Sequence, residues 1–262
     1  MTAYVEVVRD PGRPFVAELA LDRPAAHNAL STAMAHQVVA ACASLAADDS
    51  VRAVVVTSRA PKSFCVGADL KERDGFSDAD LLAQRPVFRA AFAGILDLAV
   101  PTVAAVHGFA LGGGLELALS CDLIVCDETA VLGLPEVTVG VIPGGGGTQL
   151  LVRRIGASRA ADLIFTGRRL DIDEAERLGL VDRRVADGTD REAALGLATV
   201  IAANSPVGVR NAKRALRRGA DVDLATGLDV EDAAWRATAF SADRAEGVAA
   251  FNDKRRPDWP GR

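Results

Sequence analysis

The sequence predicts an α/β fold, and three of its features support that class. Between residues 50 and 185, short apolar segments rich in β-branched residues alternate with longer segments of helical pattern, which is typical of parallel βαβ units. The turns that join strand to helix in this region are rich in glycine. Half of the 262 residues are hydrophobic and a quarter are charged, so the chain can bury the sizeable core that such a fold requires.

The N-terminal part predicts a hairpin followed by a helix. Residues 4–9 and 15–21 alternate between polar and apolar side chains on either side of an Asp-Pro-Gly turn, as the two strands of a hairpin do. Ser31 is suited to cap a helix that runs to about Ala47, because its hydroxyl can accept a hydrogen bond from the first turn of that helix.

Two strands and the start of a helix follow. Residues 51–57 form a continuous β-branched run, which indicates a strand buried on both faces, and a short strand is expected at residues 64–66. The next residues begin a helix, in which Asp69 is the expected N-cap and Glu72, three residues later, completes a capping box. The polar residues 73–80 are expected to form a mobile loop.

The rest of the chain changes from strand–turn–helix units to helices alone. A strand at residues 103–106 runs into the glycine cluster 112–114, which opens a helix that carries Glu116. Further strands are expected at residues 122–126, 130–132 and 180–185. Helices are expected at residues 79–98, from Thr148 onward after the glycines 144–147, and at residues 158–165, 173–178, 190–203, 206–218, 223–238 and 242–254. The change near residue 190 is the one candidate domain boundary.

Two of the glycine turns place backbone amides where they could bind an oxygen that becomes negative during a reaction. The first amides of a helix have no partner inside the helix, and glycine lets the backbone come close to a ligand. The N–H groups of Gly113 and of Ala68, which follows Gly67, are the expected pair of donors. Taken alone, the Gly113 turn is equally consistent with a tight strand-to-helix connection, and the Ala68 turn is explained better by a capped one.

Two glutamates near these turns are candidates for proton transfer. Glu116 is the one carboxylate in an apolar helix, and Glu136 follows Leu134 and Pro135 in apolar surroundings, where burial would raise its pKa toward neutrality. Two carboxylates that share one water molecule can act as the acid and the base of an addition or elimination. The alternative for each is a solvated or capping glutamate.

Several other kinds of site, and other locations, are not supported. The chain has no G-x-S-x-G nucleophile elbow and no G-x-x-x-x-G-K-[ST] phosphate loop. The cysteines and histidines lack metal or redox spacing, so buried reduced thiols and a turn-bonding role for His107 are expected. A formal net charge of −5 does not indicate a surface that binds nucleic acid. No secretory signal or membrane span is visible, and a cytoplasmic location without membrane partners is expected.

Three motifs together resemble those of the crotonase (enoyl-CoA hydratase/isomerase) superfamily. They are Ser-Phe-Cys-Val-Gly-Ala-Asp-Leu-Lys at residues 63–71, Gly-Phe-Ala-Leu-Gly-Gly-Gly-Leu-Glu at 108–116, and a segment at 134–149 that begins with Leu-Pro-Glu and contains the four glycines. The resemblance extends over nearly the whole chain. It implies a spiral of ββα repeats over residues 1–190 that carries the active site, and a helical region, residues 191–262, that builds homotrimers, often paired as hexamers.

The resemblance also implies a substrate and a mechanism. An acyl-CoA thioester would bind with its carbonyl on the N–H groups of Ala68 and Gly113. Glu116 and Glu136, with help from the Gly144 N–H, would hold one water molecule and add it in syn fashion to a trans-2-enoyl-CoA, which gives a 3-hydroxyacyl-CoA. Such an enzyme is a lyase of fatty acid metabolism and β-oxidation. It needs no metal or redox cofactor, because the thioester itself accepts the electrons.

By the same resemblance, the substrate and its CoA portion lie along a set of positions carried over from the family, with the two lysines facing the CoA phosphates. These positions are Ala26, Lys62, Cys65, Ala68, Asp69, Leu70, Lys71, Gly112, Gly113 and Pro135.

Within the superfamily, residues 67–73 look like the branch that contains methylglutaconyl-CoA hydratase, some members of which bind RNA. The helix associated with RNA binding would fall at residues 31–48, which contain no Lys or Arg, so RNA binding is not carried over. The alternatives are an isomerase or dehydratase acting on a specialised acyl-CoA and, in a different class, a catalytically silent member that binds acyl-CoA or RNA. The basic segment 210–218 is the best feature for RNA binding, although a solvated or subunit-facing helix explains it as well.

Overall fold

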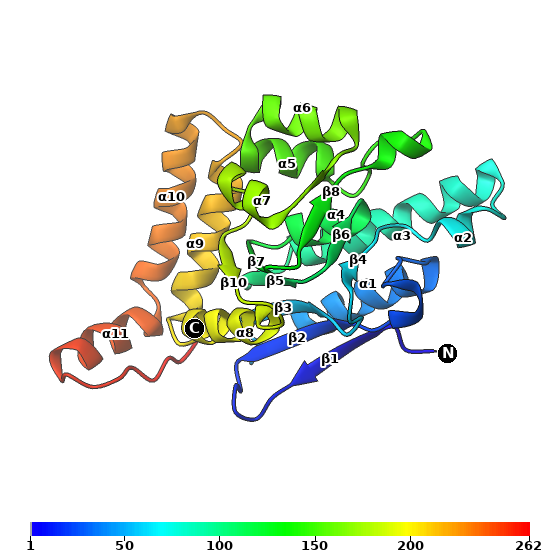
Figure 1. Cartoon of the computed structure of the whole chain (residues 1–262). Coiled ribbons are helices and arrows are strands. Elements are labelled where there is room, and N and C mark those ends of the chain that lie inside the picture. Colours follow the sequence, from blue (N-terminus) through cyan, green and yellow to red (C-terminus); the bar gives the residue numbers. More distant parts are fainter. Residues whose placement is uncertain (1) are drawn as a thin grey trace.

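Two β-sheets lie at the centre of the chain, with helices on their faces (Figure 1). The structure is a computed structural model and describes residues 2–262. In spatial order, the larger sheet consists of β1 (Val5–Arg9), β2 (Val16–Leu21), β3 (Ala53–Ser58), β5 (Thr102–Val106), β7 (Leu123–Asp127) and β10 (Arg183–Val185). The smaller sheet consists of β4 (Ser63–Cys65), β6 (Phe109–Leu111), β8 (Val131–Gly133) and β9 (Arg169–Leu170). Only β1 and β9 pair with their neighbours in antiparallel fashion within the described sheets.

Three successive units each place one strand in the larger sheet, the next strand in the smaller sheet and then a helix. β3 and β4 lead to α2 (Leu70–Arg73) and α3 (Asp78–Leu96), and β5 and β6 lead to α4 (Gly113–Leu119). β7 and β8 lead to the 3₁₀ helix η2 (Glu136–Val139) and to α5 (Gly147–Ile155). Consecutive units add their strands in parallel. The predicted α/β class and the spiral of ββα repeats are therefore confirmed.

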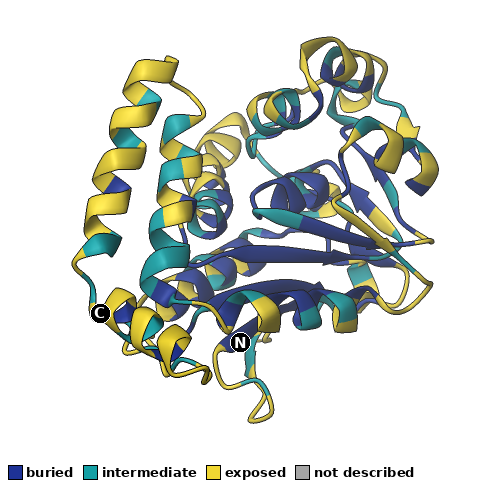
Figure 2. Cartoon of the chain, turned by 90° about the vertical axis from the view of Figure 1, so that its left-hand side faces the viewer, coloured by how far each residue is buried: buried dark blue, intermediate teal, exposed yellow. Residues whose placement is uncertain are grey.

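β3 is buried on both faces, as its β-branched sequence predicts. Val54 and Val56 belong to the main core together with residues of α1 (Thr32–Ala46), α3 and α4, whereas Val55 belongs to a second cluster with residues of α8 (Asp190–Ala202). Figure 2 shows the buried residues concentrated in the sheets and α4, between layers of helices. The strands that lead to the glycine turns thus start from a closely packed interior.

The N-terminal elements follow the prediction. β1 and β2 form the expected hairpin, and a 3₁₀ turn, η1 (Pro24–Ala26), leads toward α1. Ser31 caps α1 as predicted, because its Oγ accepts the N–H of Met34 at 3.3 Å. The helix ends at Ala46, one residue before the predicted end.

The start of α2 differs from the predicted capping box. Asp69 is the N-cap, as predicted, and accepts the first amides of α2. The carboxylate of Glu72 instead accepts the N–H of Thr32 at 2.9 Å, at the start of α1. The reason is that Leu30 forms a strand-like bridge with Ala68 and accepts the Asp69 N–H at 3.0 Å, so that the group a capping box needs is already used.

Two element boundaries and one additional strand also differ from the prediction. The connection expected at residues 73–80 is limited to residues 74–77, because Ser77 and Asp80 form a capping box that starts α3 early. β6 lies between β5 and the glycine cluster, where no strand is predicted. β10 occupies only half of the strand expected at residues 180–185. The helices α6 (Ala157–Thr166) and α7 (Ile172–Leu178) lie close to their predicted positions.

The last helices extend away from the sheets. α9 (Pro206–Gly219) and α10 (Leu224–Ala239) lie side by side, and α11 (Ala242–Asn252) follows at their far end (Figure 1). α8 packs on the larger sheet although it begins at the predicted boundary, so the division into residues 1–190 and 191–262 stays a prediction. Within the described chain, no single helix is long and apolar enough to cross a membrane; α8 and α9 reach that length and hydropathy only as a pair, bent by 108°.

Candidate active site

The turns after the parallel neighbours β4 and β6 bring two backbone amides together. Both strands end at the same edge of the smaller sheet, so the turn at Gly67 faces the N-terminus of α4. A Cβ added to Gly67 would lie 3.1 Å from the amide nitrogen of Gly113, and one added to Gly113 would lie 3.7 Å from the amide nitrogen of Ala68. Neither amide donates a hydrogen bond to another backbone group in the described chain. The structure thus brings the two predicted donors side by side.

The turn that carries Ala68 is held from both sides. The Gly67 carbonyl accepts the N–H of Leu30 at 2.7 Å, and the Leu30 carbonyl accepts the N–H of Asp69. The Asp69 carboxylate in turn lies 2.6 Å from Nη1 of Arg23. Burial acts to raise the pKa of Asp69, but the bond to Arg23 and the first amides of α2 lower it overall. The amide of Ala68 is therefore oriented by an ion pair and a strand-like bridge.

α4 can approach β4 closely because Gly114 has no side chain. A Cβ at this position would overlap the carbonyl group of Cys65, which ends β4. The contact places the first turn of α4, with its unpaired amides, against the end of the neighbouring strand. The separation of the two amide turns therefore depends on this glycine.

Glu116 lies on the first turn of α4 and is 3% exposed. Its Oε1 accepts the N–H of Gly145 at 2.6 Å and the N–H of Gly147 at 2.8 Å. Burial raises the pKa of Glu116, while the two amides and the charge of Arg85 act in the opposite direction. The result is a carboxylate of fixed orientation in dry surroundings.

The surroundings of Glu136, on η2, differ from those of Glu116. Both of its carboxyl oxygens are buried, and neither has a hydrogen-bond partner among the described residues. Its Oε1 lies 3.1 Å from the position that a Cβ on Gly112 would take, which puts it beside the amide turn of α4. Burial, with a smaller contribution from the charge on Glu116, raises the pKa of Glu136 to about 7. The carboxyl group of Glu136 is thus buried beside the amide turn, and its role in proton transfer stays a prediction.

Three groups at this site were not predicted from the sequence. They are the amides of Gly145 and Gly147, which bind Glu116, and the side chain of Arg85 on α3. The predicted Gly144 lies beside them, and its carbonyl accepts a hydrogen bond from Arg85. A run of four glycines signals a close approach of the backbone, but it does not reveal which amide points inward. Arg85 belongs to no motif, so no local signal could have identified it.

Most of the remaining residues of the predicted substrate-binding set lie in η1 or in or next to these turns, whereas Lys62 directly precedes β4, at the other end of that strand. Ala26 belongs to η1, Gly112 is the N-cap of α4, and Pro135 directly precedes Glu136. Cys65 is buried, whereas the other three are exposed: Lys62, Leu70 and Lys71. Exposed lysine side chains are open both to solvent and to the phosphates of a ligand, so their binding roles stay predictions.

His107 does not bond within its own turn, and that prediction is wrong. Its Nε2 lies 2.7 Å from the carbonyl oxygen of Ala60, and its Nδ1 lies 3.1 Å from Oδ2 of Asp190. The ring reaches out of the turn to the β3–β4 connection and to α8. The four cysteines are buried and free, as predicted. In residues 2–262, no group of three or more His, Cys, Asp or Glu side chains is arranged to hold a metal ion.

The basic helix α9 directs part of its charge into the protein. Lys213 is buried, with its Nζ 2.8 Å from Oδ2 of Asp122 and 2.8 Å from the carbonyl oxygen of Val100. Arg217 lies 2.7 Å from the other oxygen of Asp122. These two cations share the carboxylate of Asp122 and are directed into the protein, which weakens the segment's value as evidence for RNA binding.

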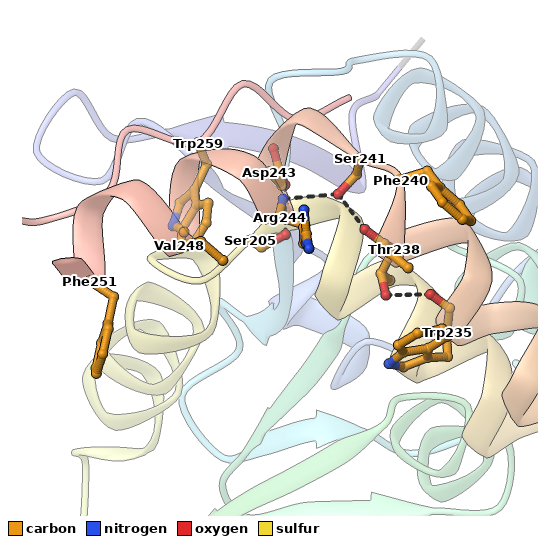
Figure 3. Close-up of a pocket in the computed structure, with 12 residues that line it drawn as sticks. Ser205, Trp235, Thr238, Phe240, Ser241, Asp243, Arg244, Val248, Phe251 and Trp259 are labelled. Carbon is orange, nitrogen blue, oxygen red and sulfur yellow. Dashed lines mark hydrogen bonds between the residues drawn. The ribbon is translucent and has the colours of Figure 1, made fainter.

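A separate hollow of about 570 Å³ lies on the C-terminal helices (Figure 3). Aromatic residues of α10, α11 and the C-terminal segment surround it, among them Trp235, Phe251 and Trp259. Phe240 and Phe251 are 90% and 82% exposed. This hollow shares no residue with the amide turns or the two glutamates, so it is separate from the candidate active site.

Comparisons with known proteins identify the family of the chain. The family model described as enoyl-CoA hydratase/isomerase matches residues 13–262. The human protein named enoyl-CoA hydratase domain-containing protein 2, mitochondrial, is 43% identical over 251 residues, which cover 94% of this chain and 86% of that protein. Human methylglutaconyl-CoA hydratase, mitochondrial, is 42% identical over 247 residues, or 93% of this chain and 73% of that protein. The crystal structure of enoyl-CoA hydratase from Bacillus anthracis superposes with a TM-score of 0.95 at 40% identity, covering 99% of this chain and 100% of the other.

Proposed function

Because the chain belongs to the crotonase (enoyl-CoA hydratase/isomerase) superfamily, we propose that it adds water in syn fashion to a trans-2-enoyl-CoA and forms a 3-hydroxyacyl-CoA. The observation that carries this proposal is the pair of glutamates beside two unpaired amides. Glu116 accepts two hydrogen bonds from backbone amides, and the carboxyl oxygens of Glu136 are buried without a hydrogen-bond partner among the described residues. An addition of water needs one base and one acid, and these two environments favour that division of roles.

The two amides would bind the thioester carbonyl oxygen. When the hydroxyl group adds to C3, negative charge moves through C2 to this oxygen and forms an enolate. The N–H groups of Ala68 and Gly113 lie side by side and are free to donate to it. Donors that are fixed before the reaction stabilise such a charge without reorganisation, and removal of one of them typically costs about 10²–10³ in rate.

The two glutamates would divide the proton transfers. Glu116, whose anion is stabilised by the amides of Gly145 and Gly147, would take a proton from the water that attacks C3. Glu136, with a pKa raised to about 7, would be protonated in about half of the molecules at pH 7 and deliver its proton to C2. The Gly144 N–H would help to hold the water. A proton then passes back from Glu116 to Glu136 before the next turnover.

The CoA portion would lie along the predicted substrate-binding residues. Lys62 and Lys71 are exposed, which suits them to bind phosphate groups. The thioester accepts the electrons of the reaction, so we propose no metal or redox cofactor. The activity would serve fatty acid metabolism or β-oxidation in the cytoplasm.

We also propose that the chain forms homotrimers, alone or paired as hexamers, through its C-terminal helices. The support is the exposed apolar surface of α10 and α11, which includes Phe240 and Phe251. Surfaces of this kind commonly mark contacts between proteins. Light scattering coupled to size-exclusion chromatography measures the mass directly, and a monomer at micromolar concentration would contradict this proposal.

The reaction is tested with enoyl-CoA thioesters of different chain length and branching in H₂¹⁸O. Hydration consumes the enoyl absorbance and places one ¹⁸O atom in the product, which mass spectrometry detects. The second candidate is an isomerase, which could shift the double bond with Glu136 alone while Glu116 only positions the substrate. The two hydrogen bonds that one oxygen of Glu116 accepts from backbone amides fix its orientation, which also suits a positioning role. A converted substrate without ¹⁸O would identify the isomerase and overturn the hydratase.

A further inference from the structure

We propose that Arg85 is a positioning residue that holds Glu116 in its anionic form, acting through the peptide group between Gly144 and Gly145. The inference rests on the proposed function, in which Glu116 is the base. No motif contains Arg85, and the arginine lies on α3, in a different repeat from α4 and from the glycine segment.

The geometry is a chain of two hydrogen bonds through one peptide group. Nη1 of Arg85 donates to the carbonyl oxygen of Gly144 at 2.6 Å, and the N–H of Gly145 donates to Oε1 of Glu116 at 2.6 Å. The carbonyl of residue 144 and the N–H of residue 145 belong to the same planar amide. A cation on the carbonyl draws electron density from the amide and makes its N–H a stronger donor. The positive charge is thereby transmitted to the carboxylate.

Packing of α3 on the glycine segment fixes the position of Arg85. Phe92 lies seven residues further along α3, on the same face of the helix. A Cβ on Gly145 would overlap the ring of Phe92, and a Cβ on Gly144 would lie 2.9 Å from Nη1 of Arg85. The contact with Phe92 requires glycine at position 145, so the segment can lie close against α3 while the Gly145 and Gly147 amides bind Glu116.

The charge of Arg85 is available to the site. No carboxylate lies within ion-pair distance of its guanidinium in residues 2–262. Arg73 of α2 is the other cation near it, and Arg85 contributes to lowering the pKa of Arg73. Arg85 acts in the same direction on the pKa of Glu116, against the effect of burial.

The other elements packed around Glu116 supply one further ionisable group, Glu136 of η2, which faces it. β4, β5 and β6 contain no charged side chain. The arginines of α5 are bound elsewhere, Arg153 to Asp221 and Arg154 to Asp182. Asp127, at the end of β7, accepts hydrogen bonds from residues 129 and 188.

The test compares the pH dependence of kcat/KM for the full-length protein and for three variants. In Arg85→Gln the acid limb, which reports ionisation of the base, moves to higher pH by about half a unit, because Arg85 is exposed and its effect is partly screened. On that limb kcat/KM then falls about threefold below the wild-type value. In Arg85→Lys, which keeps the charge, the acid limb should lie between those of the wild-type protein and Arg85→Gln. Arg89→Gln, an exposed arginine one turn further along α3, leaves the profile unchanged.

An acid limb that stays in place in Arg85→Gln, or that moves equally in Arg89→Gln, overturns the proposal, and so does an Arg85→Lys profile identical to that of Arg85→Gln. A second readout does not depend on turnover. Infrared difference titration, with Glu116→Gln as the reference, measures protonation of Glu116 directly, and the midpoint rises in Arg85→Gln. A wild-type protein that hydrates no enoyl-CoA defeats the proposed function, whereas an unchanged infrared midpoint defeats the role of Arg85.

Discussion

The two glutamates face the same amide turn, but their surroundings differ in almost every respect. Glu116 lies on a helix packed in the core, and two backbone amides bind one of its oxygens. Glu136 lies on a short 3₁₀ segment at the margin of the core, and its buried oxygens have no partner among the described residues. On one side, backbone amides oppose the rise in pKa that burial causes; on the other, burial raises the pKa of Glu136 to about 7.

The difference shows how the same residue type can serve as both base and acid. Burial alone raises the pKa of both glutamates, so it cannot separate them. The separation comes from the backbone donors of the glycine segment, which bind Glu116 and not Glu136. Substitutions that affect one side only are the way to test this comparison.

The largest effect is expected from Gly114→Ala, which disrupts the Glu116 side. The added Cβ would overlap the Cys65 carbonyl, so α4 must move away from β4 and carry both the Gly113 amide and Glu116 with it. We expect the hydration rate to fall by about 10⁴-fold and the free energy of unfolding to fall by about 3 kcal/mol. Enoyl absorbance assays and urea unfolding measure the two effects.

Two further glycines provide matched controls for this change. Gly196→Ala, in the interior of α8, meets no atom within 4 Å; it should leave the hydration rate nearly unchanged and raise the free energy of unfolding by up to about 1 kcal/mol. Gly167→Ala acts on the Glu136 side, where φ is +64° and the Cβ would lie 2.7 Å from Thr138 Cγ2. It should destabilise the protein by only about 1 kcal/mol. Equal losses in Gly114→Ala and Gly167→Ala would mean that the two sides are equally rigid.

The next effect is expected from Glu116→Gln and Glu136→Gln, each of which removes one proton-transfer group. The rate of hydration should fall by about 10²–10³-fold in each variant. A glutamine at position 116 can still accept the two amide hydrogen bonds, so folding and substrate binding should persist. Unimpaired turnover in both variants would contradict the assignment of these residues.

Much of this site could be predicted from the sequence because its parts are local. A strand, a glycine and a helix start define each amide turn, and an acidic residue in an apolar segment marks each glutamate. The non-local contacts could not be predicted in this way. Glu72 binds Thr32 because Leu30 already occupies the Asp69 N–H, and that contact joins segments about forty residues apart in sequence.

The strand β6 could not be predicted for a different reason. It has only three residues, and no alternating pattern can be read from so short a segment. Its pairing with β4 and β8 arises from the spiral, which brings equivalent segments of successive repeats to one sheet. Arg85 belongs to the same class of non-local feature, because α3 meets the glycine segment only after the repeats have stacked.

A smaller effect is expected from pH. Glu136 must be protonated to deliver its proton, so kcat/KM should fall as pH rises through about 7, by about tenfold per unit well above that value. The folded-state pKa is raised above the ordinary value of 4.5, so the associated stability is fully present below pH 4.5 and is lost as pH rises through about 7. In Glu136→Gln, the pH dependence of unfolding between these values should decrease. An unchanged dependence would show that Glu136 ionises as freely in the folded protein as in the unfolded chain.

The smallest effect is expected at His107, which lies outside the site. Its two ring nitrogens face the Ala60 carbonyl and the Asp190 carboxylate, both acceptors, so the imidazolium form satisfies both contacts. The hydrogen bond to Asp190 raises the pKa of His107, against burial. This stability is fully present below the ordinary value of 6.5 and is lost as pH rises through the raised value. His107→Gln should lower the free energy of unfolding by about 1 kcal/mol at pH 6 and by less at pH 9.

His36 provides the control for this last change, because it is exposed on α1. His36→Gln should leave the free energy of unfolding unchanged at both pH values. The rate of hydration should remain near the wild-type level in His107→Gln, since the ring contacts neither the amide turns nor the glutamates. If His107→Gln instead lost stability equally at pH 6 and pH 9, the contacts would not depend on the charge of the ring, and neutral packing would account for its contribution.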